Sequence, residues 1–422
     1  MLNVFDGLIA AQKQGEAKGL TSICSTHPWV LKTAMQTSEV SKTSEVLLVE
    51  ATCNQVNQFG GYTGMTPKDF VAYIRGIAAE NEFPFENIVL GGDHLGPNVW
   101  QHEPAESAMD KSKVLIRDYV QAGFVKIHLD CSMRLADDPQ GVLNPEVIAQ
   151  RAAQLAKVSE ESVGAGLVPA QLPRYVIGTE VPIPGGAQEY EEGVHVTKVK
   201  DARETIEVHR KAFYELGLQS AWERVIAVVV QPGVEFGDDF VLPYQPAVAK
   251  ELSHFIESQS IVYEAHSTDF QTRAALTNLV RDHFAILKVG PGLTFAFREA
   301  VFALAMIENE LIAKDQRSNI VQVLDDVMIK HPEHWQKYYR GGGADQAFKR
   351  KYSLSDRARY YWGQPEVQKA LARLMENLGK KVLPYSLLSQ FVGETGLNAA
   401  QVIEWKINKV LNDYALACGT DA

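Results

Sequence analysis

The stretch Ile88-Val89-Leu90-Gly91-Gly92-Asp93-His94-Leu95-Gly96-Pro97-Asn98 decides the fold prediction. Its apolar run of three residues is too short and too rich in β-branched side chains for a helix, and it suits a buried strand that ends in glycine, a charged pair and proline. An acid and an imidazole are therefore expected at the carboxyl end of a strand. In parallel α/β folds that edge carries the chemistry, because its loops vary while the opposite face holds the fold together.

Seven further apolar runs alternate with helical segments along the chain. Helix starts are marked by Thr66-Pro67-Lys68-Asp69 and Asn144-Pro145-Glu146, which place a capping side chain before a proline and an acid in the first turn. Eight strand–helix units predict an α/β fold of the (β/α)8 TIM-barrel type, since each parallel strand needs a crossover. An open doubly wound sheet is the alternative, but no G-x-G-x-x-G follows the first strand. The predicted strands are Leu20 to Cys24, Val46 to Ala51, Ile88 to Gly91, Val125 to Leu129, Val176 to Glu180, Val225 to Val230, Ile261 to Ala265 and Ala285 to Val289.

The pattern changes after the last predicted barrel helix, Phe295 to Leu311. Residues 315–422 have helical character, are rich in aromatic side chains and contain Gly341-Gly342-Gly343, and they show no further strand–helix unit. We therefore predict a TIM barrel over residues 1–314 and a helical extension over residues 315–422 that packs on it.

The composition narrows the possible partners. The 422 residues carry a net charge of −11, with 46% hydrophobic and 22% charged residues, which is ordinary for a globular protein. The negative charge argues against nucleic acid and against an anionic membrane surface, since both need clustered Lys and Arg. No signal peptide, membrane-spanning run or C-x-x-C pair is present in the sequence, so we expect a cytoplasmic protein without a disulfide framework; a homo-oligomer is left open.

The carboxyl ends of the predicted strands deliver polar groups to one face. Asp93 beside His94 pairs a general base with a metal ligand, because a carboxylate can take a proton from a hydroxyl and an imidazole binds divalent metals. The alternative is that a histidine here only hydrogen-bonds a carboxylate. The predicted catalytic carboxylates are Asp93, Asp130 and Glu264. The predicted ligands of an N,N,O site for Zn²⁺ or Mn²⁺ are His94, Glu180 and His266.

The loop after the eighth strand, Gly290-Pro291-Gly292-Leu293-Thr294, runs into a helix. Loops at this position of a barrel often bind phosphate through backbone amides, while a capped turn without ligand is the alternative. The predicted phosphate or substrate contacts are Ser267, Lys288, Gly290, Gly292 and Thr294. Lys288 could form a Schiff base or serve as an ion-pair partner of Glu50 or Glu264. Three arginines could bind a distal phosphate or pin the extension: Arg298, Arg357 and Arg359.

Several motifs together resemble one family. These are Glu50 to Met65 (EATCNQVNQFGGYTGM), Gly91 to Asn98, Lys126 to Asp130 (KIHLD), Val230 to Gly237 (VQPGVEFG), Tyr263 to Asp269 (YEAHSTD) and Tyr352 to Arg357 (YSLSDR). They are similar to the GatZ/KbaZ family, the Z subunits of class II D-tagatose-1,6-bisphosphate aldolase, nearly from end to end.

The resemblance implies a TIM barrel in galactitol or amino-sugar catabolism. It implies an accessory subunit that supports a zinc-dependent Y subunit, which cleaves tagatose 1,6-bisphosphate to glycerone phosphate and glyceraldehyde 3-phosphate. Relatives have also been assigned as ketose 4-epimerases, so the alternative is a self-sufficient metal-dependent enzyme that interconverts tagatose 6-phosphate and fructose 6-phosphate. Both interpretations predict a phosphorylated ketohexose as ligand, and no nucleotide, since the P-loop pattern G-x-x-x-x-G-K-[ST] is missing.

Overall fold

The computed structural model describes residues 3–40, 46–164, 171–179 and 196–419. Eight parallel strands close into a barrel in the order β1-β10-β9-β6-β5-β4-β3-β2, which confirms the predicted TIM barrel. A two-stranded antiparallel hairpin, β7 (Glu235–Phe236) with β8 (Val241–Leu242), lies outside it and was not predicted. The barrel strands are β1 (Leu20–Ile23), β2 (Leu47–Thr52), β3 (Ile88–Leu95), β4 (Lys126–Leu129), β5 (Arg174–Ile177), β6 (Val225–Val229), β9 (Val262–Ala265) and β10 (Phe284–Val289).

The helices start where the sequence signals place them. Thr66 caps α3 by accepting from the Asp69 amide, with the Asp69 carboxylate accepting from the Thr66 amide in return, and Asn144 caps α5. α10 begins at Pro291, one turn earlier than predicted, because a proline at the first helical position has no N–H to leave unpaired. The helices around the barrel are α1 (Val4–Lys13), α2 (Pro28–Val40), α3 (Pro67–Glu80), α4 (Ala105–Ala122), α5 (Pro145–Ser162), α6 (Val199–Glu215), α7 (Gln219–Trp222), α8 (Pro246–Glu257), α9 (Arg273–Arg281) and α10 (Pro291–Leu311).

α1 closes the amino-terminal mouth of the barrel. Phe5 and Leu8 of this helix are buried in one apolar cluster with side chains from the barrel strands, including Leu48, Val176 and Ile286. An ion pair between Asp6 and Arg174 at 2.7 Å fastens the helix to β5. The opposite mouth is therefore the one that can receive a ligand.

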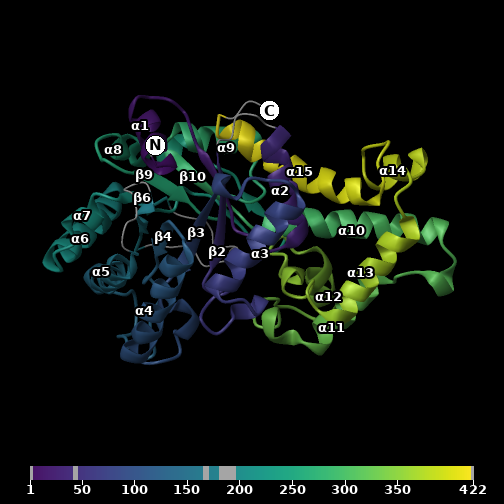
Figure 1. Ribbon diagram of the computed structural model, residues 1–422, viewed down its shortest axis with the longest axis horizontal. Helices are drawn as coiled ribbons and strands as arrows, with labels where there is room; N and C mark the ends of the chain where they lie inside the picture. Colours follow the sequence, from purple (N-terminus) through teal and green to yellow (C-terminus); the bar gives the residue numbers. More distant parts are fainter. Residues whose placement is uncertain (1–2, 41–45, 165–170, 180–195, 420–422) are drawn as a thin grey trace.

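The chain after α10 forms a helical extension, as predicted. α10 and α15 (Ala399–Ala417) run side by side and project from the barrel, with α13 (Pro365–Leu378) and α14 (Tyr385–Phe391) toward their far ends (Figure 1). α15 also packs against α2 and α9, and α11 (Ile320–Lys330) and α12 (Gly343–Tyr352) lie below α10. The boundary at residue 314 stays a prediction. Within the described part of the chain, no helix is long and apolar enough to cross a membrane.

Candidate functional site

Asp93 and His94 lie inside β3, which continues to Leu95 and does not end before them as predicted. The pairing of β3 with β4 shifts register between Gly92 and Leu95, and His94 has a left-handed backbone with φ 48°. Neighbours in a regular strand face opposite sides, whereas a bulge re-aims a side chain. The irregularity therefore lets both side chains of the Asp-His pair reach the barrel interior.

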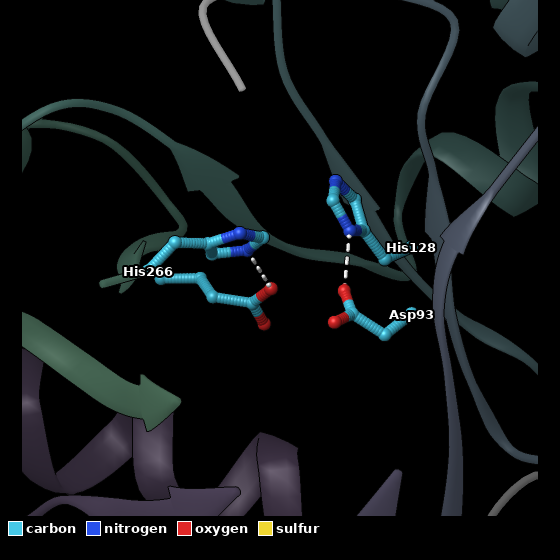
Figure 2. A group of neighbouring side chains, drawn as sticks. Asp93, His128 and His266 are labelled. Atoms are coloured by element: carbon cyan, nitrogen blue, oxygen red, sulfur yellow. Dashed lines mark hydrogen bonds and ion pairs between the residues drawn. The ribbon is translucent and has the colours of Figure 1, made fainter. Parts of the chain in front are cut away.

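Three imidazoles meet at the carboxyl end of the barrel. The ring centroids of His94, His128 and His266 are 5.0–5.2 Å apart. Figure 2 shows Asp93, His128 and His266 gathered at one place, with a dashed contact joining His128 to Asp93. Each imidazole has one ring nitrogen on a carboxylate oxygen: His94 Nδ1 on Asp130 at 2.8 Å, His128 Nδ1 on Asp93 at 2.9 Å, and His266 Nε2 on Glu264 at 2.9 Å.

Two buried lysines form a layer of ion pairs beneath the imidazoles. Lys126 Nζ is 2.8 Å from Glu50 and 2.7 Å from Glu264. Lys288 Nζ is 2.6 Å from Asp93, 2.8 Å from Glu50 and 3.4 Å from Glu264. Burial alone would lower the pKa of Lys288, but the surrounding carboxylates hold it well above its usual value. Lys288 is thus a charged ion-pair partner, the second of its two predicted roles, and not a free amine for a Schiff base.

Asp93 and Glu264 are ionised carboxylates of the cluster. Burial would raise the pKa of Asp93, yet His94 and Lys288 hold it well below its usual range. Burial also opposes ionisation of Glu264, and Lys126 and Lys288 outweigh it in the same way. Burial lowers the pKa of His266 to about 4, so this ring is neutral at pH 7. The pKa of His94 is raised by Asp93 and Asp130 in spite of burial, so this ring can also carry a proton.

The net charge of this buried cluster calls for a cation. It holds four carboxyl groups and only two lysine side chains. Buried charges in proteins are paired or coordinate metals, because an uncompensated one is costly. The four carboxyl groups belong to Glu50, Asp93, Asp130 and Glu264, and the two lysines are Lys126 and Lys288.

The donor atoms fit a divalent metal. Asp93, His128, Glu264 and His266 each offer one ligand atom, all within 4.8 Å of one another. The Nε2 atom of His128 is buried and has no hydrogen-bond partner among the described residues, as expected of a nitrogen that coordinates a metal ion. Metal-bound histidines place their other nitrogen on a carboxylate, which is the arrangement of all three imidazoles.

The sequence placed part of this set. His266 belongs to the group of four, and the His94 ring lies beside it. Glu180 falls outside the described residues. His128 was missed because Asp130 was the one residue taken from the end of the fourth strand, although Lys126, His128 and Asp130 alternate along the chain here and so share one face.

A cavity of about 530 Å³ opens above the cluster, bounded by Asp93, His94 and His266 at its base. The predicted phosphate contacts Ser267, Lys288, Gly290 and Thr294 also line it. The amides of Gly290 and Gly292, however, donate to Asp269 Oδ1 at 2.9 and 2.7 Å, and Thr294 Oγ1 donates to the Pro291 carbonyl. The loop is therefore satisfied by the protein's own groups, and phosphate binding there stays a prediction.

The fold and the cluster define a TIM-barrel protein with an ionisable site at its carboxyl-terminal mouth. The chain belongs to the GatZ/KbaZ family: the model of the family described as D-tagatose-1,6-bisphosphate aldolase subunit GatZ/KbaZ-like matches residues 5–419, which confirms the resemblance inferred from the motifs.

Two relatives are named D-tagatose-1,6-bisphosphate aldolase subunit GatZ. The proteins from Klebsiella pneumoniae subsp. pneumoniae and Salmonella paratyphi B are each 51% identical to this chain over 423 residues, which covers 98% of this chain and 99% of theirs. A solved structure, described as a probable tagatose 6 phosphate kinase from Sinorhizobium meliloti 1021, is 45% identical with a TM-score of 0.86 and covers 95% of this chain and 100% of its own.

Proposed function

We propose that this chain is the Z-type subunit of a D-tagatose-1,6-bisphosphate aldolase and supports the cleavage of tagatose 1,6-bisphosphate to glycerone phosphate and glyceraldehyde 3-phosphate. Family membership and the end-to-end match with subunits of that name support this role. The partner is a Y-type aldolase subunit. The galactitol or amino-sugar pathway, the cytoplasmic location and a homo-oligomeric state stay predictions from the sequence.

One observation carries a chemical role for the chain itself, namely the buried cluster beneath the cavity. His128, His266 and His94, with the carboxylates beside them, would hold a divalent metal, and imidazole-rich sites suit Zn²⁺, with Mn²⁺ as the alternative. A bound metal supplies a Lewis acid that polarises a ketose carbonyl. The ionised Asp93 lines the cavity and would accept the proton of a substrate hydroxyl, while Asp130 fixes the His94 ring through its hydrogen bond.

This cluster favours a second candidate function. All of its groups come from one chain, as a self-sufficient metal-dependent 4-epimerase of tagatose 6-phosphate and fructose 6-phosphate would require. Cleavage between C3 and C4, rotation of the trapped aldehyde and re-addition would invert C4 with the same base, so the two activities differ in whether the aldehyde escapes. The description of the Sinorhizobium meliloti relative names a kinase, but a P-loop kinase reaction has no support in this chain, because G-x-x-x-x-G-K-[ST] is missing from the sequence.

The test uses the purified chain with its metal content quantified. It is assayed with tagatose 6-phosphate and tagatose 1,6-bisphosphate, alone and with an added Y-type subunit. Asp93→Asn removes the proposed base and should lower turnover about 10²- to 10⁴-fold. Because Asp93 is also one of the four donor groups, turnover is expressed per bound metal. His128→Ala should lose the metal.

The control is Asp110→Asn, which changes a carboxylate whose side chain is 66% exposed. Turnover by the chain alone that Asp93→Asn abolishes establishes the 4-epimerase or aldolase activity as its own. Activity only with the Y-type subunit establishes the accessory role. A chain that neither turns over a ketose phosphate nor stimulates a Y-type subunit contradicts both functions.

A further inference from the structure

The structure separates the three arginines that the sequence left as equivalent phosphate candidates. Arg298 of α10 pairs with Asp356 at 2.7 Å and donates to the Lys351 and Ser353 carbonyls, so it pins the extension to the barrel. Arg357 donates to the His334 carbonyl at 3.0 Å, and its guanidinium lies 3.1 Å from the centroid of the Tyr338 ring. Both side chains are committed to packing within the extension and against α10.

Arg359 differs from both because it lines the cavity above the cluster. It belongs to η7 (Arg357–Tyr360), a short 3-10 helix of the extension that Asp356 precedes in a left-handed conformation with φ 45°. The ion pair of Asp356 with Arg298 therefore fixes the segment that carries Arg359 over the barrel mouth. The extension thus contributes a side chain to the barrel's cavity.

The hydrogen bonds of the Arg359 guanidinium go to neutral groups. Its Nη1 donates to the Ser355 and Asp356 carbonyls, and its Nη2 donates to the Tyr360 hydroxyl at 3.1 Å. Among the residues that the structure describes, it forms no ion pair with a carboxylate, and its Nε has no hydrogen-bond partner. A half-buried guanidinium that contacts no carboxylate directly, and on which Asp356 and Asp269 act only at longer range, has a planar shape suited to bidentate contacts and is suited to an anionic ligand.

The cavity is therefore polarised. The cluster residues Asp93, His94 and His266 line it at one place, and Arg359 lines it together with Tyr62 and Tyr360. The rings of Tyr62 and Tyr360 are 4.6 Å apart, and burial raises the pKa of Tyr62 to about 12, so its hydroxyl remains a hydrogen-bond donor at pH 7. The other anion position of the cavity, the amides that open α10, is already filled by the Asp269 carboxylate.

We propose that Arg359, with the Tyr62 hydroxyl beside it, binds the phosphate monoester of a ketose phosphate whose carbonyl end lies at the cluster. The assignment rests on the proposed function for the identity of the sugar. It makes the extension part of the binding site and moves the phosphate away from the Gly290–Gly292 turn.

The test measures binding by calorimetry, so it needs no turnover. Metal-loaded wild type, Arg359→Met and Arg359→Lys are titrated with tagatose 6-phosphate, with unphosphorylated tagatose and with inorganic phosphate. Arg359→Met should weaken tagatose 6-phosphate about 10- to 100-fold, because a charge-assisted contact is lost, and should abolish binding of inorganic phosphate. Affinity for tagatose should change less than about twofold, as for an exposed substitution. Arg359→Lys keeps the positive charge but not the planar guanidinium group. Its affinity for tagatose 6-phosphate should therefore lie between those of wild type and Arg359→Met.

Arg273→Met is the matched control, since Arg273 lies on α9, its side chain is 57% exposed, and it pairs with Asp413. Thermal unfolding of each variant shows whether the fold is kept, and Arg359→Lys carries the test if Arg359→Met does not fold. An unchanged affinity for tagatose 6-phosphate, or an equal loss for tagatose, overturns the proposal, as does a wild type that binds neither ketose phosphate nor inorganic phosphate.

The failure of the site and that of the proposed function give different results. Phosphate binding that depends on Arg359 in a chain without turnover, alone or with a Y-type subunit, supports the site and contradicts the function. Turnover that Asp93→Asn abolishes, with Arg359→Met binding like wild type, supports the function and contradicts the site.

Discussion

The two ends of the barrel differ in chemistry although the same strands build both. Near the amino-terminal mouth the interior is apolar and sealed by α1, whereas two residues further along three of the strands the inward-facing side chain is charged. Successive inward-facing side chains of one strand are two positions apart. In these strands, one inward-facing residue therefore packs in the apolar core and the next belongs to the charged cluster. The pairs are Leu48 and Glu50 in β2, Val262 and Glu264 in β9, and Ile286 and Lys288 in β10.

The comparison implies that stability depends mainly on the apolar layer and metal binding on the charged one. Phe5→Ala removes a fully buried ring from the apolar layer and should lower the free energy of unfolding by about 3 to 5 kcal/mol. Metal content of the folded protein should stay unchanged, because Phe5 belongs to a cluster separate from the donor atoms. Urea unfolding followed by circular dichroism, with metal analysis of the same sample, measures both quantities.

Phe348→Ala is the control, since this ring of the extension is 50% exposed and its loss should cost no more than about 0.5 kcal/mol. Loss of metal from folded Phe5→Ala protein would break the comparison, because the two layers would then depend on each other.

The barrel could be predicted from the sequence because its strands are short β-branched runs and the helices between them have capping residues. Short apolar runs and helix caps are both local patterns, which can be recognised without knowledge of the fold. Asp93, His94 and His266 could be brought together for a general reason, since parallel strands end on the same face. His128 was not predicted, because Asp130 alone was taken from the end of the fourth strand.

Contacts between segments that are distant in the sequence could not be predicted from local sequence patterns. The bulge that turns both Asp93 and His94 inward depends on the pairing of β3 with β4. The Asp269 carboxylate that fills the Gly290–Gly292 turn, and the placement of Arg359 over the barrel, join segments that no local pattern relates.

Asp269 lies at the carboxyl-terminal end of the barrel, but its carboxylate has a structural role, because it accepts from the Gly290 and Gly292 amides. Burial raises its pKa from 3.8 to about 6, against the opposing effect of the two amides that it accepts from. Between these values the folded state binds a proton that the unfolded state does not, so this contribution is full below about pH 4 and is lost as pH rises through 6. It amounts to at most about 3 kcal/mol. The stability of wild type relative to Asp269→Asn should therefore fall between pH 4 and 7.

The difference between wild type and variant is the quantity to measure, by urea unfolding at several pH values. Asp93 and Glu264, whose pKa values are depressed, give both proteins an opposite slope at acid pH. Asp110→Asn serves as the exposed control. Parallel curves for wild type and Asp269→Asn would show that the Asp269 carboxylate is not held in its raised state.

Asp130→Asn tests whether a residue of the charged end can act on the metal site with little effect on the fold. The Asp130 carboxylate accepts from His94 Nδ1 at 2.8 Å and from the Ser132 hydroxyl and amide, so it sets which nitrogen of His94 faces the cluster. An asparagine keeps the size and can still accept from Ser132 through its single oxygen, but it places an NH2 group opposite His94 Nδ1 and removes the negative charge that strengthens the imidazole as a ligand. Metal affinity should fall about 10- to 100-fold, the effect usual for a carboxylate behind a metal-bound histidine.

Competition with a chelator of known affinity gives the dissociation constant, and unfolding of the same variant without metal should match metal-free wild type. An unchanged metal affinity would mean that His94 contributes no ligand, leaving the group of Asp93, His128, Glu264 and His266 as the complete donor set.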